Sequence, residues 1–224
     1  MIDYILIRTT RKTVALYVRN GVAEVRAPLK TPTSEIEKFV ASKEQWITKH
    51  LAQSELNAKQ RGAFTLNYGD AAMFCGTEYP LLAESGMRIG FDGERFFMPP
   101  SLSPEQIKSA VVQIYRRLAK LHLTRRVAQY AGLMNVSPSV VKISGAKNRW
   151  GSCSAKKSLN FSWRLVMADE AVIDYVIVHE LAHITELNHS ARFWAIVASV
   201  IPDYKERQKR LKDLQRRLSA EVWE

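Results

Sequence analysis

The sequence reads His179-Glu180-Leu181-Ala182-His183-Ile184-Thr185-Glu186-Leu187-Asn188-His189, a run that holds three of the five histidines in the 224-residue chain. Its first five residues have the pattern HExxH. On an α-helix, four residues advance about 6 Å and turn about 400°, so His179 and His183 project from the same side. We therefore expect these two imidazoles to share one cation.

The third histidine follows closely enough to join the pair. Asn188 predicts a left-handed end to the helix and Ser190 predicts the N-cap of the next one, so His189 would lie at a sharp reversal of the chain. Three imidazoles with one open coordination position form the ligand set of a catalytic zinc site. Glu180 would then serve as the general base. Glu186 is the rival third ligand.

The rest of the chain predicts an α+β protein with a β-rich front over residues 1–100 and a helical rear. Short alternating segments in the front predict strands, the first three of them in an antiparallel meander, and one helix that begins near Ser34. Pro99-Pro100-Ser101 marks the boundary, because proline discourages helix in the preceding residue. In the rear, strands at Val140 to Ser144 and Ser158 to Met167 predict a small antiparallel sheet. Helical patterns there cover 169–186, 190–201 and 204–218.

Composition indicates a protein with a full hydrophobic core and a basic surface. Hydrophobic residues make up 46% of the chain, and 33 lysines and arginines against 22 acidic residues give a net charge of +11. No apolar run approaches the roughly 18 residues of a transmembrane helix, and the start lacks a signal-peptide core, so we expect a cytoplasmic protein with no membrane partner. The two cysteines, Cys75 and Cys153, fit a reducing compartment. The sequence gives no indication of an oligomeric state.

Motifs around the histidine run carry a resemblance to a known family. They are Asn148-Arg149-Trp150-Gly151-Ser152-Cys153-Ser154, the strand Leu159 to Leu165, Asn188-His189-Ser190-Ala191-Arg192-Phe193-Trp194 and Pro202-Asp203-Tyr204. Together they resemble the YgjP-like metallopeptidase family and, more distantly, the SprT-like proteases. The resemblance extends over most of the chain, and it implies a zincin-type core with zinc on His179, His183 and His189 and catalysis by Glu180. With the proline boundary, this core belongs to a zincin-like metallopeptidase domain over residues 101–224.

These observations together predict a zinc metallopeptidase with a polypeptide substrate. The strand Ser158 to Met167 could be a sheet edge to which an extended peptide adds. Tyr204 or Arg192 could donate a hydrogen bond to the oxyanion that forms during hydrolysis. Hydrolysis of a small amide or an ester is the rival enzymatic interpretation. The alternative from another class is a DNA-associated protein, recruited to nucleic acid through the basic surface and the helix 204–218.

Overall fold

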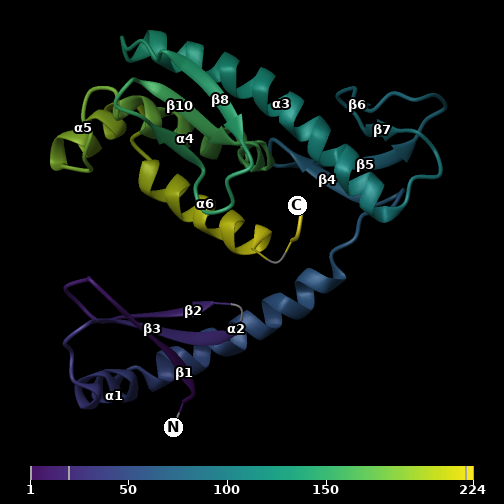
Figure 1. Ribbon diagram of the computed structural model, residues 1–224. Helices are drawn as coiled ribbons and strands as arrows, with labels where there is room; N and C mark the ends of the chain where they lie inside the picture. Colours follow the sequence, from purple (N-terminus) through teal and green to yellow (C-terminus); the bar gives the residue numbers. More distant parts are fainter. Residues whose placement is uncertain (1, 20, 220, 224) are drawn as a thin grey trace. The chain divides into compact units, whose positions relative to one another are not determined.

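The computed structural model describes residues 2–19, 21–219 and 221–223, with the backbone alone for residues 57–63. The chain divides into two compact units, residues 1–64 with 219–222 and residues 65–218 with 223–224. The predicted α+β class is confirmed, because both units combine helices with small sheets (Figure 1). Within the described ranges, none of the helices has the length and apolar character needed to cross a membrane. The domain boundary predicted between residues 100 and 101 stays a prediction.

The first unit packs a three-stranded sheet against two helices. Its elements are β1 (Tyr4–Thr9), β2 (Ala15–Arg19), β3 (Val22–Pro28), α1 (Thr33–Ser42) and α2 (Glu44–Ala63). The predicted antiparallel meander is wrong, because β3 is the central strand and pairs antiparallel with β2 but parallel with β1. Alternation of polar and apolar residues decides which face of a strand is buried, but it does not choose the strand's neighbours. The core of this unit consists of Ala23, Val25, Ala27, Ile36, Val40 and Ile47.

Two helices replace the single helix predicted for the front of the chain. Pro32 occupies the N-cap position of α1, so Ser34 lies inside the helix rather than capping it. α1 ends where the amide of Lys43 donates to the carbonyl of Val40 (3.0 Å), the tighter bond typical of a last helical turn. Val40 and Ile47 are seven residues apart and both buried, so the apolar pattern continues across the break and does not reveal it.

The second unit begins with a four-stranded sheet and a long helix. The sheet has the order β4-β5-β7-β6, formed by β4 (Ala71–Phe74), β5 (Thr77–Ala83), β6 (Gly90–Phe91) and β7 (Phe96–Met98). α3 (Pro104–Leu133) follows and begins with a capping box between Ser103 and Gln106. Tyr115 of α3 stacks on Trp163 with ring centroids 5.5 Å apart, and both side chains are fully buried. This packing fixes α3 against the segment that leads into the histidine-bearing helix.

The rear of the second unit holds a three-stranded sheet and three helices. Its strands are β8 (Val140–Ser144), β9 (Gly151–Cys153) and β10 (Ser158–Ser162), in the order β8-β10-β9, and its helices are α4 (Glu170–Ala182), α5 (Ala191–Val200) and α6 (Tyr204–Leu218). The sheet predicted as antiparallel is mixed, because β8 runs parallel to β10 and only β9 runs antiparallel to it. The strand predicted to reach Met167 ends at Ser162, and a short 3-10 helix, Trp163–Met167, follows it.

Candidate metal centre

α4 is enclosed by other elements of the second unit. It contacts α3, α5, α6 and β9 (Figure 1). Its N-cap, Asp169, accepts a hydrogen bond from the amide of Val172 (3.1 Å). Among residues 172–182 every residue is buried except His179, which is partly exposed. The one interruption in the burial of this helix therefore lies at the first residue of the HExxH pattern.

The three histidines of the run lie at the end of α4 and in the loop that follows. The helix was expected to reach Glu186 but ends at Ala182, and His183 is its C-cap with φ −65° and ψ −15°. These angles are still helical, so the side chain of His183 keeps the four-residue relation to His179. His189 comes from the loop just before α5.

Hydrogen bonds of Asn188 and Ser190 shape the end of the loop between α4 and α5. The side chain of Ser190 accepts a hydrogen bond from the amide of Phe193 (3.3 Å), as expected for the N-cap of α5. Asn188 is not among the described residues with positive φ, so it does not form the predicted left-handed end. Its side-chain oxygen instead accepts a hydrogen bond from the amide of Ser190 (3.1 Å), which bends the loop in front of α5.

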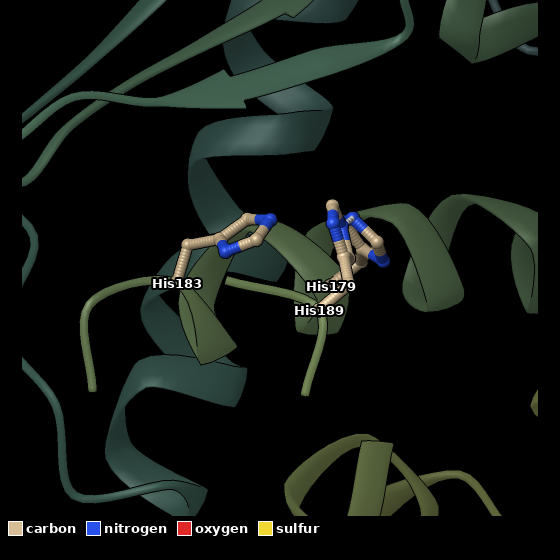
Figure 2. Close-up of side chains that lie close together, drawn as sticks. All are labelled: His179, His183 and His189. Atoms are coloured by element: carbon tan, nitrogen blue, oxygen red, sulfur yellow. Dashed lines mark hydrogen bonds between the residues drawn. The ribbon is translucent and has the colours of Figure 1, made fainter. Parts of the chain in front are cut away.

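The three imidazoles converge on one point. Figure 2 shows a ring nitrogen of His183 facing the rings of His179 and His189. One nitrogen from each residue can be chosen so that all three lie within 4.8 Å of one another. The Nε2 atoms of His179 and His189 are 3.1 Å apart. Two nitrogens held tetrahedrally by one zinc ion would be about 3.3 Å apart, so the donor set fits such an ion.

Two of these rings, those of His183 and His179, are in protonation states that allow a nitrogen to bind a cation. The carbonyl of Glu186 can only accept a hydrogen bond, so Nδ1 of His183, at 3.1 Å from it, carries the proton and leaves the lone pair on Nε2. Burial, followed by the charges of the other two histidines, lowers the pKa of His179 to about 3, which keeps this ring neutral at pH 7. Nδ1 of His179 is buried and makes no hydrogen bond within the described part of the chain. The rings of Phe193 and Trp194 pack beside the cluster.

Glu180 lies next to the first histidine and is buried, with 6% of its surface exposed. Burial raises the pKa of its carboxyl to about 7, although the charge of Arg149 acts in the opposite direction. The backbone of Gly151 in β9 approaches this carboxylate so closely that a Cβ there would lie 2.6 Å from Cγ and 2.7 Å from Oε1 of Glu180. Gly151 therefore leaves the space that the carboxylate occupies. The sequence shows this glycine within the motif around Trp150 but gives no reason for it.

The other side chains considered from the sequence lie around the cluster. The carboxylate of Glu186 is not part of the converging group, and its Oε2 lies 4.0 Å from Nε of Arg192, whose side chain is 77% exposed. The ring of Tyr204 stacks on Trp194 at 5.1 Å, and Trp194 in turn packs against His189. Tyr204 thus belongs to the aromatic layer beside the histidines, whereas Arg192 belongs to the surface.

The sheet edge nearest Glu180 is not the one expected. β10 is paired on both sides, by β8 and by β9, so it has no free edge for an extended peptide. β9 is the edge strand next to α4. The amide of Ser154 donates to the carbonyl of Ser158, and the carbonyl of Trp150 accepts from the amide of Ser162, so Trp150 and Ser154 face β10. The residues that alternate with them, Gly151 and Cys153, therefore direct their amides and carbonyls away from β10.

Comparisons with known proteins agree with the predicted family. The family model described as YgjP-like, metallopeptidase domain matches residues 12–214. No curated protein matches the chain. Among solved structures, the chain is similar to two metallopeptidase zymogens at 24% identity: Pyrococcus abyssi abylysin, with a TM-score of 0.38 over 41% of this chain and 92% of that one, and Methanocaldococcus jannaschii jannalysin, with 0.37 over 41% and 94%. The family match spans most of the chain, which therefore belongs to the YgjP-like metallopeptidase family, and this membership implies a metal, typically zinc, and polypeptide substrates.

Proposed function

We propose that this protein is a zinc-dependent peptidase, with zinc held by His179, His183 and His189 and with Glu180 as the general base. The observation that carries the proposal is the convergence of three imidazoles beside a buried carboxyl group. Three neutral nitrogens leave one position of a tetrahedral ion open, which is typical of catalytic rather than structural zinc sites. Glu186 is not the third ligand in this proposal, because its carboxylate faces Arg192 instead.

The residues around the ion would divide the work of peptide hydrolysis. Zinc, when bound, supplies a Lewis acid and lowers the pKa of a coordinated water to about 7. Glu180 accepts a proton on its carboxylate and passes it to the leaving amine. Its burial and the close approach of Gly151 hold that carboxylate in one place, which is what proton transfer over hydrogen-bond distance requires. Tyr204 remains a proposed oxyanion donor, one aromatic ring away from His189.

The open edge of β9 supports a polypeptide as the substrate. The amides and carbonyls of Gly151 and Cys153 point away from β10, so an extended peptide could pair with them as an added strand. Gly151 also lies against Glu180, so a strand added at this edge would run past the proposed base. Main-chain pairing of this kind is tolerant of sequence, which favours unfolded or flexible protein segments as substrates.

The test combines metal analysis with digestion of a denatured protein. Zinc-loaded wild type should cleave the substrate, and Glu180→Gln should retain zinc but lose about 10² to 10⁴ of the cleavage rate, because the amide cannot accept the proton. Glu206→Gln removes an exposed carboxylate on α6 and serves as the matched control with unchanged cleavage. Equal cleavage by wild type and Glu180→Gln would remove Glu180 as the base. Absence of cleavage by zinc-loaded wild type on denatured proteins and peptide libraries would contradict the peptidase proposal.

The DNA-associated alternative rests on the net charge of +11 and gains no support from the geometry of α6. Arg207 pairs with Asp203 (3.0 Å), and Arg210 pairs with Asp169 (2.7 Å), so part of the positive charge on this helix is used within the protein. Binding to DNA stays a prediction. Retention on DNA that weakens steeply with salt would support it, and no retention at low salt would dismiss it.

A further inference from the structure

A second group of metal-binding side chains lies at the other end of α4. Cys75 is in the turn between β4 and β5, His122 is on α3, and Glu170 is the first residue of α4. Nε2 of His122 lies 3.7 Å from Sγ of Cys75 and 3.6 Å from Oε1 of Glu170, and one donor atom from each residue lies within 4.8 Å of the other two. The group is separate from the three histidines, because His179 lies nine positions after Glu170, about 14 Å along the helix.

The arrangement differs from that of a catalytic triad. In a triad the nucleophile and the orienting carboxylate approach opposite nitrogens of the imidazole. Here the thiol and the carboxylate both approach Nε2 of His122. This nitrogen either carries a proton, which it can give to one of them, or accepts one, so it cannot serve both groups as a hydrogen-bond partner. A cation would satisfy all three groups at once.

The separations match those between ligands of one zinc ion. With bond lengths of about 2.3 Å to sulfur and 2.05 Å to nitrogen or oxygen, a tetrahedral site places sulfur and nitrogen about 3.6 Å apart and nitrogen and oxygen about 3.4 Å apart. The observed 3.7 Å and 3.6 Å agree within a few tenths of an ångström. The carboxylate contact is also longer than a good hydrogen bond, so direct bonding between His122 and Glu170 does not explain it.

The turn that presents the thiol is held firmly against the start of α4. The amide of Cys75 donates to the carbonyl of Val166 (2.7 Å), and a Cβ on Gly76 would lie 2.9 Å from Cα of Asp169. Cys75 and Gly76 have φ of +49° and +81°, as in a type I′ hairpin turn, where asparagine is preferred at the position of Cys75. Cysteine is therefore less favourable for the backbone here than asparagine would be.

The surrounding charges are compatible with a divalent cation. A thiolate from Cys75 and a carboxylate from Glu170 would together neutralise its two positive charges. Arg125 and Arg126 are the nearby positive groups, and Arg126 is committed to Asp174 through hydrogen bonds from both Nε and Nη2.

We propose that Cys75, His122 and Glu170 bind a second zinc ion, which fastens the β4–β5 turn and α3 to the first turn of α4. One thiolate, one imidazole and one carboxylate form a borderline-soft donor set that suits zinc better than magnesium or calcium. The side chain of Glu170 is 51% exposed, so the ion can enter from solvent, and water can fill the fourth position. This site is independent of the proposed peptidase activity.

Cobalt(II) gives a readout that depends on a thiolate ligand. The three histidines offer no sulfur, so absorption from thiolate-to-cobalt charge transfer in the full-length protein reports Cys75 or Cys153, and a serine variant of each cysteine distinguishes the two. Addition of cobalt(II) to the metal-free wild type should produce this absorption, and Cys75→Ser should abolish it. Glu170→Gln, a conservative change at an exposed position, should weaken cobalt binding by at least about tenfold. Cys153→Ser is the matched control and should retain the full absorption.

Zinc content separates this inference from the peptidase proposal. Wild type should hold two zinc ions, and Cys75→Ser and His189→Ala should each hold one. A single zinc in wild type that is lost in Cys75→Ser would support the second site and contradict the proposed active site. A single zinc that is lost in His189→Ala, or the absence of thiolate-to-cobalt absorption in wild type, would overturn the second site. Loss of the absorption in Cys153→Ser would overturn it as well.

Discussion

The two ends of α4 carry groups of similar size but different origin. At the C-terminal end, His179, His183 and His189 lie within eleven consecutive positions, and the spacing alone predicts that they meet. At the N-terminal end, Cys75 and His122 are 47 residues apart, and Glu170 is as far again along the chain. The first group needs a helix and a loop, whereas the second needs the whole second unit to be folded. A local spacing can therefore predict one candidate metal site, whereas the other can be found only from the folded structure.

The largest expected effect is the loss of bound metal at one end of α4 while the other end still binds it. His189→Ala should remove zinc from the C-terminal end only, and cleavage of a denatured protein should fall by about 10³-fold or more, because the Lewis acid supplies several kcal/mol. Zinc content and thiolate-to-cobalt absorption, measured on the same preparation, should show that the N-terminal end still binds metal.

Glu186→Ala is the control for this variant, since Glu186 is the rival third ligand of the same loop. Its carboxylate faces Arg192 at 4.0 Å, so we expect cleavage to stay within about twofold of wild type. Loss of zinc in Glu186→Ala with zinc retained in His189→Ala would exchange the roles of the two residues.

The next largest effect concerns the middle of α4, which connects the two ends. Asp174 accepts hydrogen bonds from Arg126 and from the hydroxyl of Tyr130 (2.8 Å), and its side chain is 10% exposed. Arg126→Ala leaves a buried carboxylate without its main partner, which should lower the free energy of unfolding by about 3 kcal/mol. Hydrogen exchange of α4 amides should then accelerate by roughly 10²-fold at both ends of the helix.

Arg125→Ala is the matched control, because Arg125 is exposed and adjacent to Arg126 in sequence. The rates of hydrogen exchange of the α4 amides in this variant should remain within about twofold of those in wild type. Acceleration at one end of α4 alone after Arg126→Ala would mean that the two sites do not share this support.

Much of the second unit was predictable because its determinants are local. The HExxH spacing, the N-cap Ser190 and the apolar pattern of residues 204–218 each depend on neighbours within a few residues, and the structure has the expected α5 and α6. The parallel pairing of β1 with β3 was not predictable, since alternation decides faces and not partners. The approach of Gly151 to Glu180 was missed for a similar reason, because it joins a strand to a helix across 29 positions.

A smaller effect should come from filling the space beside Glu180. Gly151→Ala would place a Cβ 2.7 Å from Oε1, so the carboxylate must move while the three histidines keep their ion. A displacement of about 1 Å is enough to slow cleavage by roughly tenfold to 10²-fold. We expect this loss in kcat, with zinc content equal to that of wild type.

Gly132→Ala is the control, since a Cβ there meets nothing within 4 Å and the residue lies inside α3 without a positive φ. It should leave cleavage unchanged and stabilise the helix by up to about 1 kcal/mol. Normal kcat in Gly151→Ala would mean that the carboxylate has room to adjust, and that β9 does not position it.

The smallest effect tests why a cysteine occupies the turn at the other end of α4. Asparagine tolerates the positive φ of Cys75 better, so Cys75→Asn should raise the free energy of unfolding of the metal-free protein, by less than about 1 kcal/mol. The same variant should lose the stabilisation that added zinc gives to wild type through the second site. Ser101→Asn, at an exposed position with φ +65°, is the control. It should also raise the free energy of unfolding slightly, but it should leave unchanged the stabilisation that added zinc gives. If Cys75→Asn instead destabilised the metal-free protein by more than about 1 kcal/mol, the thiol would be a packing group, and cysteine would need no metal to explain its place in the turn.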